Sequence, residues 1–260
     1  MDLGLENRVA IVTGASRGIG KAIAESFARE GCRVAICARG REDLRATAEE
    51  LQAVAGSEGV LAVRLDLTAR TAARRLHERV RKHFGTVDIL VNNLGGNRKK
   101  PFDETTDQDW DDLLELNLLS SLRMSREVIP PMKAQGRGAL LFIASIWGRE
   151  AGGPGYALYN TTKSGMISAA KIMSVELASA GIRVNSIAPG SIRFPGGGWD
   201  SRANADPEGI ARFVDESLPL GRFGTVDEVA QLAVFLASDR ASLITGACIP
   251  ADGSQGKSLI

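Results

Sequence analysis

A chain of 260 residues with 44% hydrophobic content can fill a sizeable core, as one large domain or two small ones. A formal net charge of +1 and a longest strong apolar run, 138–148, of about half the length of a membrane helix argue against nucleic-acid and membrane partners. The N-terminus lacks a signal-peptide pattern and the three cysteines are scattered, so we expect a soluble, cytoplasmic protein with reduced thiols, no disulfide and no metal.

Short apolar runs alternate with longer amphipathic segments along the whole chain. Runs with few polar residues predict buried strands at 8–14, 33–38, 60–66, 87–93, 139–145, 182–190 and 246–253. The segments between them predict helices, of which the clearest lie at 21–31, 41–55 and 159–178. Strands that alternate with helices imply parallel pairing through right-handed crossovers. The sequence therefore predicts an α/β fold with a doubly wound parallel sheet, as a single domain over residues 1–260.

One segment, 190–207, breaks this pattern with three consecutive glycines, two prolines and Trp199. A long irregular stretch inside a compact domain is often a lid or a binding loop. The segment starts where a predicted strand ends, and open α/β sheets bind ligands at that edge. We therefore expect a substrate lid over about 190–217, in preference to a disordered surface loop.

A glycine-rich turn follows the first predicted strand and opens the first helix. Gly14, Gly18 and Gly20 allow a tight turn and a close approach of the backbone to a phosphate. The free N–H groups at the start of the helix would then face an anion. Strand, glycines and helix follow one another in the order that a dinucleotide site requires, so the turn predicts dinucleotide binding.

The end of the second predicted strand distinguishes NADP(H) from NAD(H). A site that selects NAD(H) usually has a carboxylate there for the ribose 2′-hydroxyl group. This chain has Ala38 and Arg39 instead, and Arg17 in the glycine turn could reach the same group. A guanidinium can hold a 2′-phosphate through two hydrogen bonds. The sequence therefore predicts NADP(H), in preference to NAD(H).

The segment 155–165 contains both tyrosines of the chain and a lysine. If 159–178 is helical, Tyr159 and Lys163 lie four residues apart on one face, whereas Tyr156 precedes the helix. A nearby ammonium group lowers the pKa of a phenol, which is about 10 in free tyrosine. A large shift also needs exclusion of water or a second positive charge, which an oxidised nicotinamide ring would supply. The spacing favours Tyr159 as the acid or base of a hydride-transfer reaction.

Six motifs together resemble the short-chain dehydrogenase/reductase family in its short single-domain form. In the order that the family has them, they are TGASRGIG (13–20), NNLGG (92–96), LNLLS (116–120), IAS (143–145), YNTTK (159–163) and APG (188–190). Within the family the chain is similar to the 3-oxoacyl carrier-protein reductases. The resemblance implies a Rossmann-like parallel sheet of seven strands in the order 3-2-1-4-5-6-7, and assembly as a homotetramer or homodimer.

The resemblance also implies the roles of individual residues. Tyr159 would be the acid or base, and Ser145 would hydrogen-bond the substrate oxygen. Lys163 would hold the nicotinamide ribose, and Asn117 would position a water that links Lys163 to solvent. Outside that context, Ser145 could merely end a strand and Asn117 could cap or kink a helix. The implied cofactor-binding residues are Gly14, Ser16, Arg17, Gly18, Ile19, Gly20, Arg39, Asp66, Leu67, Asn93, Gly95, Tyr159, Lys163, Pro189, Gly190 and Ile192.

The chain departs from the family pattern at several positions. Ser145 and Tyr159 lie fourteen residues apart, one more than is usual. Leu94 replaces a customary alanine, and Phe194 stands where a threonine commonly contacts the cofactor. Ala180 stands where the carrier-protein reductases often have a docking arginine. These changes indicate a reshaped floor of the site and a differently closed lid, and they argue against a carrier-protein partner.

The substrate is the least determined part of the prediction. We expect an apolar, partly aromatic pocket lined by Ser145, Ile146, Trp147, Tyr156 and Trp199. The basic run Arg98, Lys99 and Lys100 could attract an anionic thioester or lie in a solvated loop. The predicted activity is NADP(H)-dependent hydride transfer between nicotinamide and a carbonyl or secondary alcohol, with a 3-oxoacyl thioester as one substrate. A free ketone, sugar, polyol or steroid alcohol is an equal alternative, and a non-catalytic NADP(H) sensor is the alternative from another class.

Overall fold

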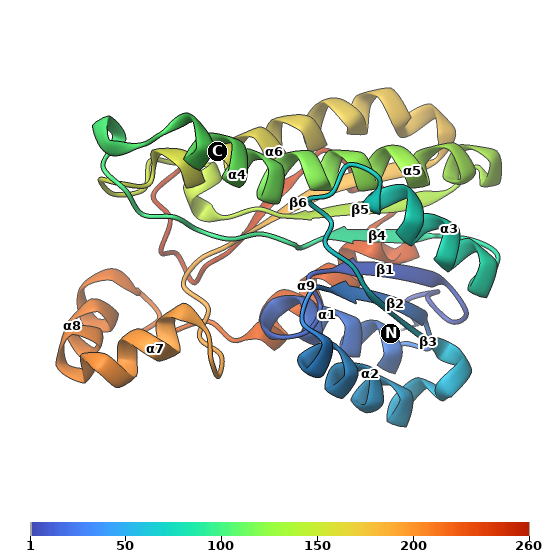
Figure 1. Cartoon of the computed structure of the whole chain (residues 1–260), viewed down its shortest axis with the longest axis horizontal. Helices are drawn as coiled ribbons and strands as arrows, with labels where there is room; N and C mark the ends of the chain where they lie inside the picture. The colour runs from blue at the N-terminus through green and yellow to red at the C-terminus, as the bar shows by residue number, and fades with distance from the viewer. Residues whose placement is uncertain (1, 260) are drawn as a thin grey trace.

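The computed structural model describes residues 2–259, in which seven strands form one parallel sheet with the order β3-β2-β1-β4-β5-β6-β7 (Figure 1). The strands are β1 (Val9–Thr13), β2 (Arg33–Ala38), β3 (Val60–Arg64), β4 (Ile89–Asn92), β5 (Gly138–Ile143), β6 (Ile182–Pro189) and β7 (Cys248–Ala251). The fold class and the strand order expected from the resemblance are both confirmed. The strand order reverses between β1 and β4, and the carboxyl ends of strands at such a switch point form a ligand-binding crevice.

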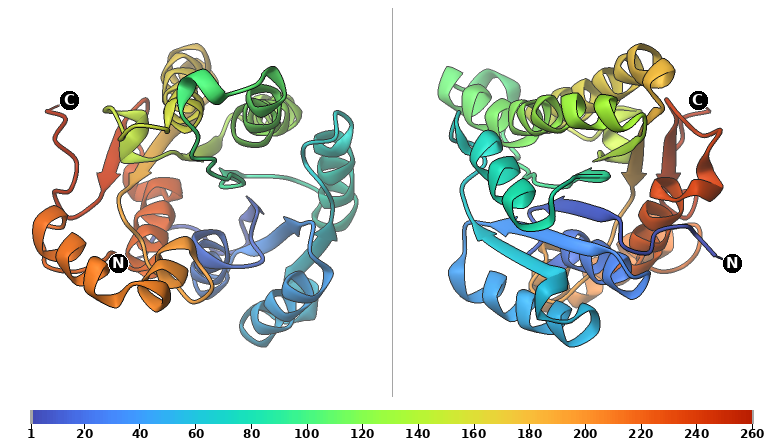
Figure 2. Two further views of the ribbon diagram at one scale, coloured as in Figure 1. Left: turned by 60° about the vertical axis from the view of Figure 1, so that its left-hand side comes forward. Right: turned by 90° about the vertical axis from the view of Figure 1, so that its right-hand side faces the viewer.

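Helices cover both faces of the sheet (Figure 2). One face packs against α1 (Gly18–Arg29), α2 (Arg41–Ala55) and α9 (Val226–Ala237), and the other against α3 (Ala72–Phe84), α5 (Ser120–Gln135) and α6 (Ala157–Leu177). Side chains of β1 alternate between the two cores: Ala10 and Val12 face the side of α1, whereas Val9 and Ile11 face the side of α3. Because both faces are covered, the strands are apolar at nearly every position, which is why they were recognisable in the sequence.

The segment after β6 is more regular than its composition predicts. It contains α7 (Gly198–Ala205) and α8 (Pro207–Ser217), which stand apart from the two helical layers in Figure 1. The prediction of an irregular stretch as far as residue 207 is therefore wrong from residue 198 onward. Pro207 is the first residue of α8, where its missing N–H group costs nothing, and the Asp206 carboxylate accepts a hydrogen bond from Gly209 N at 2.9 Å. This proline starts a helix.

The remaining elements are short. The helix α4 (Asp107–Leu114) continues through a π-helical turn, Glu115–Leu119, into α5. The 3₁₀ turns are Ser57–Gly59, Phe102–Glu104, Ile146–Gly148, Ala178–Ala180 and Asp239–Ala241. Within residues 2–259, no helix combines the length and the apolar character needed to cross a membrane.

Candidate active site

The helix α6 places Tyr159 and Lys163 one turn apart. The Nζ atom of Lys163 lies 5.7 Å from the centroid of the Tyr159 ring. Tyr156 precedes α6 as its N-cap residue, and its ring packs against Trp147 with the centroids 4.4 Å apart. The fold therefore places the phenol of Tyr159 beside the ammonium group, as the spacing in the sequence predicts.

Ser145 lies at the start of the 3₁₀ turn that follows β5. Its Oγ atom accepts a hydrogen bond from Trp147 N at 3.2 Å. Ser145 and Tyr159 line the same cavity, in which a substrate oxygen could contact both hydroxyl groups. Outside any functional context the same hydroxyl group would serve as a cap of the turn, so its geometry suits both roles.

The unusual spacing before Tyr159 is accommodated by a loop that Asn160 holds in place. The Asn160 amide donates hydrogen bonds to the backbone oxygen atoms of Trp147 and Glu150, and its Oδ1 accepts one from Gly152 N. These bonds pin the loop to the first turn of α6. The extra residue therefore enlarges the loop and leaves the relation between β5 and α6 intact.

Lys163 is buried between α6 and the sheet. Its side chain is 4% exposed, and its Nζ atom donates a hydrogen bond to Ile143 O, at the end of β5, at 2.7 Å. No acidic side chain of the described residues pairs with it, so its charge is stabilised by a carbonyl oxygen alone. A buried ammonium without a counter-charge is costly, and such groups often have a functional reason.

Asn117 lies in the π-helical turn and is fully buried. Its Nδ2 donates to Gly96 O and Thr162 Oγ1, both at 3.0 Å, and its Oδ1 accepts from Gly96 N at 2.8 Å. A Cβ atom on Gly95 would lie 3.2 Å from Asn117 Oδ1 and 3.4 Å from Lys163 Nζ, so the three residues meet at one point. π-Helical turns are rare and frequent at functional sites.

Burial determines the protonation of both titratable groups. It raises the pKa of Tyr159 above its ordinary value of 10, an effect that a contact with the Ser145 hydroxyl group opposes in part. Burial also lowers the pKa of Lys163 from 10.5 to about 8. The direction at Tyr159 is opposite to the one expected from the sequence, because loss of hydration on burial is the largest influence on this phenol. At pH 7 Tyr159 therefore holds its proton, which is the state that a general acid needs.

A cavity of about 560 Å³ lies over the glycine-rich turn, at the carboxyl ends of β1 and β2. A Cβ atom on Gly14 would lie 3.0 Å from the backbone of Leu94, and one on Gly20 would lie 2.3 Å from Asn93 Nδ2. There is therefore no space for a side chain at Gly14 or Gly20, and a phosphate group can approach the backbone closely. This geometry suits a dinucleotide. Nine of the predicted cofactor-binding residues line this cleft: Gly14, Ser16, Arg17, Ile19, Gly20, Arg39, Leu67, Asn93 and Gly95.

The other predicted cofactor-binding residues lie elsewhere. A neighbouring cavity, described below, is lined by Tyr159, Gly190 and Ile192. Outside the lining of both cavities are Gly18, Asp66, Lys163 and Pro189. Gly18 lies beneath the ring of Phe194, since a Cβ atom on this glycine would come within 2.6 Å of it. The Asp66 carboxylate lies 3.6 Å from Arg39 Nη1.

Both arginines predicted to recognise a 2′-phosphate line the dinucleotide cleft, as does Asp43, a carboxylate that the sequence reasoning did not consider. Arg17 Nη1 donates a hydrogen bond to Gly196 O at 3.3 Å, which ties the glycine turn to the segment after β6. Two guanidinium groups against one carboxylate leave an excess of positive charge in the lining of the cleft.

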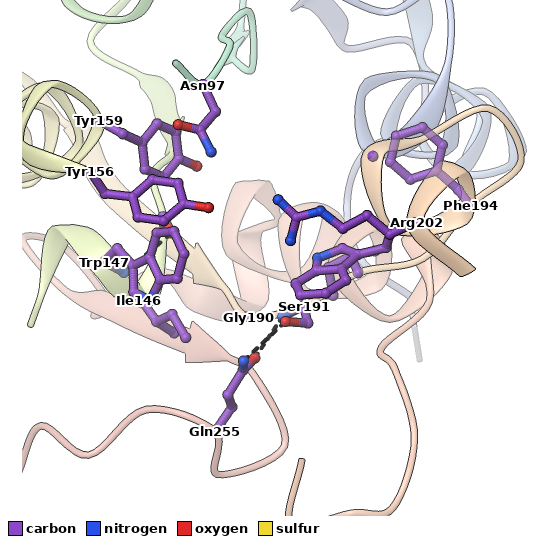
Figure 3. A pocket seen from close by; sticks show the side chains of 14 residues that line it. Asn97, Ile146, Trp147, Tyr156, Tyr159, Gly190, Ser191, Phe194, Arg202 and Gln255 are labelled. Carbon is purple, nitrogen blue, oxygen red and sulfur yellow. Dashed lines mark hydrogen bonds between the residues drawn. The ribbon is translucent and has the colours of Figure 1, made fainter. Parts of the chain in front are cut away.

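The neighbouring cavity, of about 240 Å³, lies between the ends of β5 and β6, the start of α6, and α7 (Figure 3). All five predicted substrate-binding residues line it: Ser145, Ile146, Trp147, Tyr156 and Trp199. The sequence reasoning did not find the other polar and aromatic lining residues, which are Asn97, Ser191, Phe194, Arg202 and Gln255. The cavity is therefore lined by aromatic and polar side chains together, and Asn97, Arg202 and Gln255 add polar groups beside the aromatic residues expected from the sequence.

Gln255 contributes a polar side chain to the cavity from the C-terminal segment. Its Oε1 accepts a hydrogen bond from Ser191 N at 2.7 Å, and its Nε2 donates one to Ser191 Oγ at 3.0 Å (Figure 3). The two residues are 64 positions apart, so no local pattern in the sequence could have brought them together.

The basic run after β4 is largely neutralised within the protein. Arg98 pairs with Asp109 at 2.5 Å and with Asp112 at 3.3 Å, and Lys100 pairs with Asp109 at 2.8 Å. Only Lys99 lacks an acidic partner among the described residues. The hypothesis that this run attracts an anionic substrate therefore loses two of its three charges.

We expect the double substitution Arg98→Gln and Lys100→Gln to lower the midpoint of thermal unfolding and to leave KM unchanged within about twofold. The reason is that Asp109 caps α4 together with Thr106 and would lose both cationic partners. Calorimetry and initial rates measure the two effects. Lys99→Gln is the matched control and should leave the midpoint unchanged, while a raised KM at an unchanged midpoint in the double variant would contradict this account.

Comparisons with known proteins place these features in context. A family model described as Enoyl-(Acyl carrier protein) reductase matches residues 14–254. The 3-oxoacyl-(acyl-carrier-protein) reductase FabG of Thermotoga maritima is 36% identical over 249 residues, which are 96% of this chain and 98% of that protein. The FabG protein of Escherichia coli K12 is 36% identical over 251 residues, with the same shares covered. The structure of L-sorbose reductase from Gluconobacter frateurii, complexed with NADPH and L-sorbose, has a TM-score of 0.94 at 34% identity, with full coverage of both chains.

Proposed function

The chain belongs to the short-chain dehydrogenase/reductase family, and we propose that it is an NADP(H)-dependent reductase of a small, polar ketone. One observation carries this proposal. A protonated Tyr159 lies beside Ser145 in a cavity next to a dinucleotide-sized cleft, one helical turn from the buried Lys163. A phenol, a hydroxyl donor and a buried cation at one point are the groups that reduction of a carbonyl requires.

The four side chains divide the proposed chemistry among them. NADPH, when bound, would supply a hydride to the carbonyl carbon of the substrate. Tyr159 gives its proton to the carbonyl oxygen, so that the ketone becomes a secondary alcohol. Ser145 donates a hydrogen bond to the same oxygen while negative charge develops on it. Lys163 stabilises the phenolate left on Tyr159, and Asn117 fixes the segment that packs against Lys163.

The preference for NADP(H) is supported by the charge of the cleft. Arg17 and Arg39 line it on the side of β2, where a 2′-phosphate is expected, and the end of β2 carries no carboxylate. The structurally similar L-sorbose reductase was solved with NADPH bound. Asp43 is the one acidic residue of the lining, against two arginines. Asp66, which pairs with Arg39 at 3.6 Å, would share that guanidinium with a 2′-phosphate.

We expect Arg39→Gln to raise the KM for NADPH about tenfold and to leave the KM for NADH unchanged, because a hydrogen bond to a charged group is lost only with the phosphorylated cofactor. Initial rates at saturating ketone measure both constants. Arg41→Gln removes an exposed charge two residues away and is the matched control. An equal rise of both KM values in Arg39→Gln would show that the arginine does not bind the 2′-phosphate.

Two kinds of ketone compete as substrates. A small, polar ketone is favoured by the volume of about 240 Å³ and by the polar lining residues Asn97, Ser191 and Gln255. A 3-oxoacyl thioester is favoured by the 36% identity to FabG proteins. Against the thioester, Ala180 offers no cation for a carrier protein, and the basic run after β4 is already paired. We therefore give precedence to the small ketone.

An assay that measures NADPH consumption by its near-ultraviolet absorbance tests the proposal on a panel of ketones. The panel should contain ketoses, simple ketones, keto acids and a 3-oxoacyl thioester. Turnover of any ketone that depends on Tyr159 supports the proposal. Binding of NADPH without turnover of the whole panel would favour the non-catalytic sensor and overturn it.

We also propose that the enzyme assembles as a homotetramer or homodimer through α5 and α6. On α6 the side chains of Ile172 and Val175 are 57% and 70% exposed, and Leu119, just before α5, is 38% exposed. Large apolar side chains that lie exposed on adjacent helices are typical of surfaces that bind another protein chain.

A further inference from the structure

We propose that the substrate carries an anionic group, a carboxylate or a phosphate, and that Arg202 binds it. This inference rests on the proposed ketone reductase function and names its substrate class as small oxo acids or phosphorylated ketones. Arg202 is the one charged side chain among the residues that line the substrate cavity. The cavity therefore offers a single fixed positive charge and no carboxylate to balance it.

The guanidinium group of Arg202 faces the reacting groups. Arg202 lies on α7, and Figure 3 shows its guanidinium directed into the cavity, toward the wall that carries Tyr156 and Tyr159. A ligand that extends across the cavity from Tyr159 would meet this group. The substrate oxygen that takes the proton and the anionic group would then be held at opposite sides of the same small space.

No acidic side chain of the described residues forms an ion pair with this guanidinium. Among residues 2–259, Arg202 makes no side-chain hydrogen bond and no ion pair, although two aspartates lie close to it in the chain. Asp200 is bound to Arg193 at 3.2 Å and to Gly196 N at 3.1 Å. Asp206 caps α8 through Gly209 N. The donors of Arg202 are therefore left for a ligand.

The arginine is nevertheless held in place. Its Cζ atom lies 4.8 Å from the centroid of the Trp199 ring, in the arrangement of a cation–π contact. Trp199 in turn stacks on Phe213 with the centroids 4.5 Å apart, and lies 5.1 Å from Phe223. Such a contact orients the guanidinium plane without using its N–H groups, which remain available for a carboxylate or phosphate through two hydrogen bonds.

The surroundings of the cavity add to its positive potential. Lys99 Nζ lies 5.4 Å from the centroid of the Tyr156 ring, at the wall opposite α7, and has no acidic partner among the described residues. Two carboxylates next to the C-terminal segment are already engaged in backbone hydrogen bonds. Glu150 accepts one from Lys257 N, and Asp252 accepts others from the backbone of its own turn. An anion in the cavity therefore meets Arg202 and no acidic side chain of the lining, and Lys99 near the Tyr156 ring adds to the positive potential.

The size of the cavity suits a short substrate. A volume of about 240 Å³ is small beside that of common ligand sites, which begin at about 300 Å³. A ketone of a few carbon atoms with a terminal carboxylate or phosphate fits these limits. A long acyl chain would extend beyond the cavity.

Pairs of ketones that differ only in charge test the inference. The carboxylate arm compares acetoacetate and levulinate with their methyl esters, and the phosphate arm compares dihydroxyacetone phosphate with dihydroxyacetone. We expect kcat/KM of the wild-type enzyme to be higher for the anionic member of at least one pair. Arg202→Gln should lower kcat/KM for that member about 10- to 100-fold and leave the neutral member unchanged within about twofold. Arg202→Lys should restore part of the loss.

Arg212→Gln, which removes an exposed charge from α8 outside the cavity lining, is the matched control and should change neither member of a pair. Calorimetric titration of levulinate and dihydroxyacetone phosphate into the NADP⁺-loaded protein gives a readout without turnover, and Arg202→Gln should weaken binding by the same factor. Preference for the neutral members, or an equal loss for both members in Arg202→Gln, would overturn the inference. If the wild-type enzyme reduces neutral ketones with full dependence on Tyr159, the proposed function stands and only the anionic substrate class falls.

Discussion

Tyr159→Phe is expected to lower kcat for ketone reduction about a thousandfold, the size of a typical general-acid contribution. The substitution keeps the ring, whose centroid lies 6.2 Å from that of Trp147, and removes only the hydroxyl group that would give the proton. Because Tyr159 does not line the dinucleotide cleft, the Kd for NADPH should stay within about twofold. Single-turnover kinetics, together with fluorescence titration of NADPH, separate the two quantities.

Tyr156→Phe is the matched control for this loss. It removes a phenol hydroxyl group from the same cavity, three residues earlier and outside the helix. Its ring contacts Trp147, and Lys163 lies over the ring of Tyr159 instead, so we expect at most about a tenfold change, the effect of one neutral hydrogen bond. Comparable losses in the two variants would contradict the assignment of Tyr159, as would wild-type turnover in Tyr159→Phe.

The second large effect concerns both activity and stability. Lys163→Met should lower kcat about a hundredfold or more, because the phenolate of Tyr159 loses its neighbouring cation. The same substitution should make the protein more stable at pH 7. Burial lowers the pKa of Lys163 to about 8, which corresponds to about 3 kcal/mol of free energy lost by keeping the ammonium buried. Loss of the hydrogen bond to Ile143 O opposes this by about 1–3 kcal/mol, so the net gain is about 1 kcal/mol.

The pH dependence of that gain gives the sharper measurement. Below pH 8 the lysine is protonated in both the folded and the unfolded chain, and the wild-type protein bears the full cost of burial. Between 8 and 10.5 the unfolded chain binds more protons than the folded chain, so the wild-type free energy of unfolding rises with pH. The advantage of Lys163→Met should therefore shrink across this window. Urea unfolding at pH 7 and within the window measures it.

Lys171→Met serves as the control because Lys171 is exposed on the same helix. Its substitution should change the free energy of unfolding by less than about 0.5 kcal/mol at either pH. A destabilised Lys163→Met protein, or a difference that does not change with pH, would show that the lysine is better solvated than its burial indicates.

Much of the fold could be predicted because a sheet covered on both faces needs strands that are apolar throughout. The position of the proposed catalytic pair could be predicted as well, because two residues four apart on a helix share one face, as Tyr159 and Lys163 do. The strand order needed the family resemblance, because an alternation of strands and helices does not specify it.

The features that sequence reasoning missed depend on contacts between distant residues. The helices α7 and α8 were hidden by glycine and proline, whose effect depends on whether they lie at the start or inside a helix. Gln255 reaches the cavity only because the C-terminal segment folds back on Ser191. The direction of the pKa shift at Tyr159 was missed because the spacing gives the neighbour of a group and says nothing about how deeply the group is buried.

Phe194 borders both the dinucleotide cleft and the substrate cavity, and its ring rests on Gly18. If the dinucleotide or the substrate moves this ring when it binds, the binding free energy of the other ligand changes. Thermodynamic linkage requires that the two affinities respond by the same factor. A single aromatic side chain in the segment between β6 and α7 would thus make the binding of the dinucleotide and of the ketone cooperative. The sheet beneath the two sites need not change.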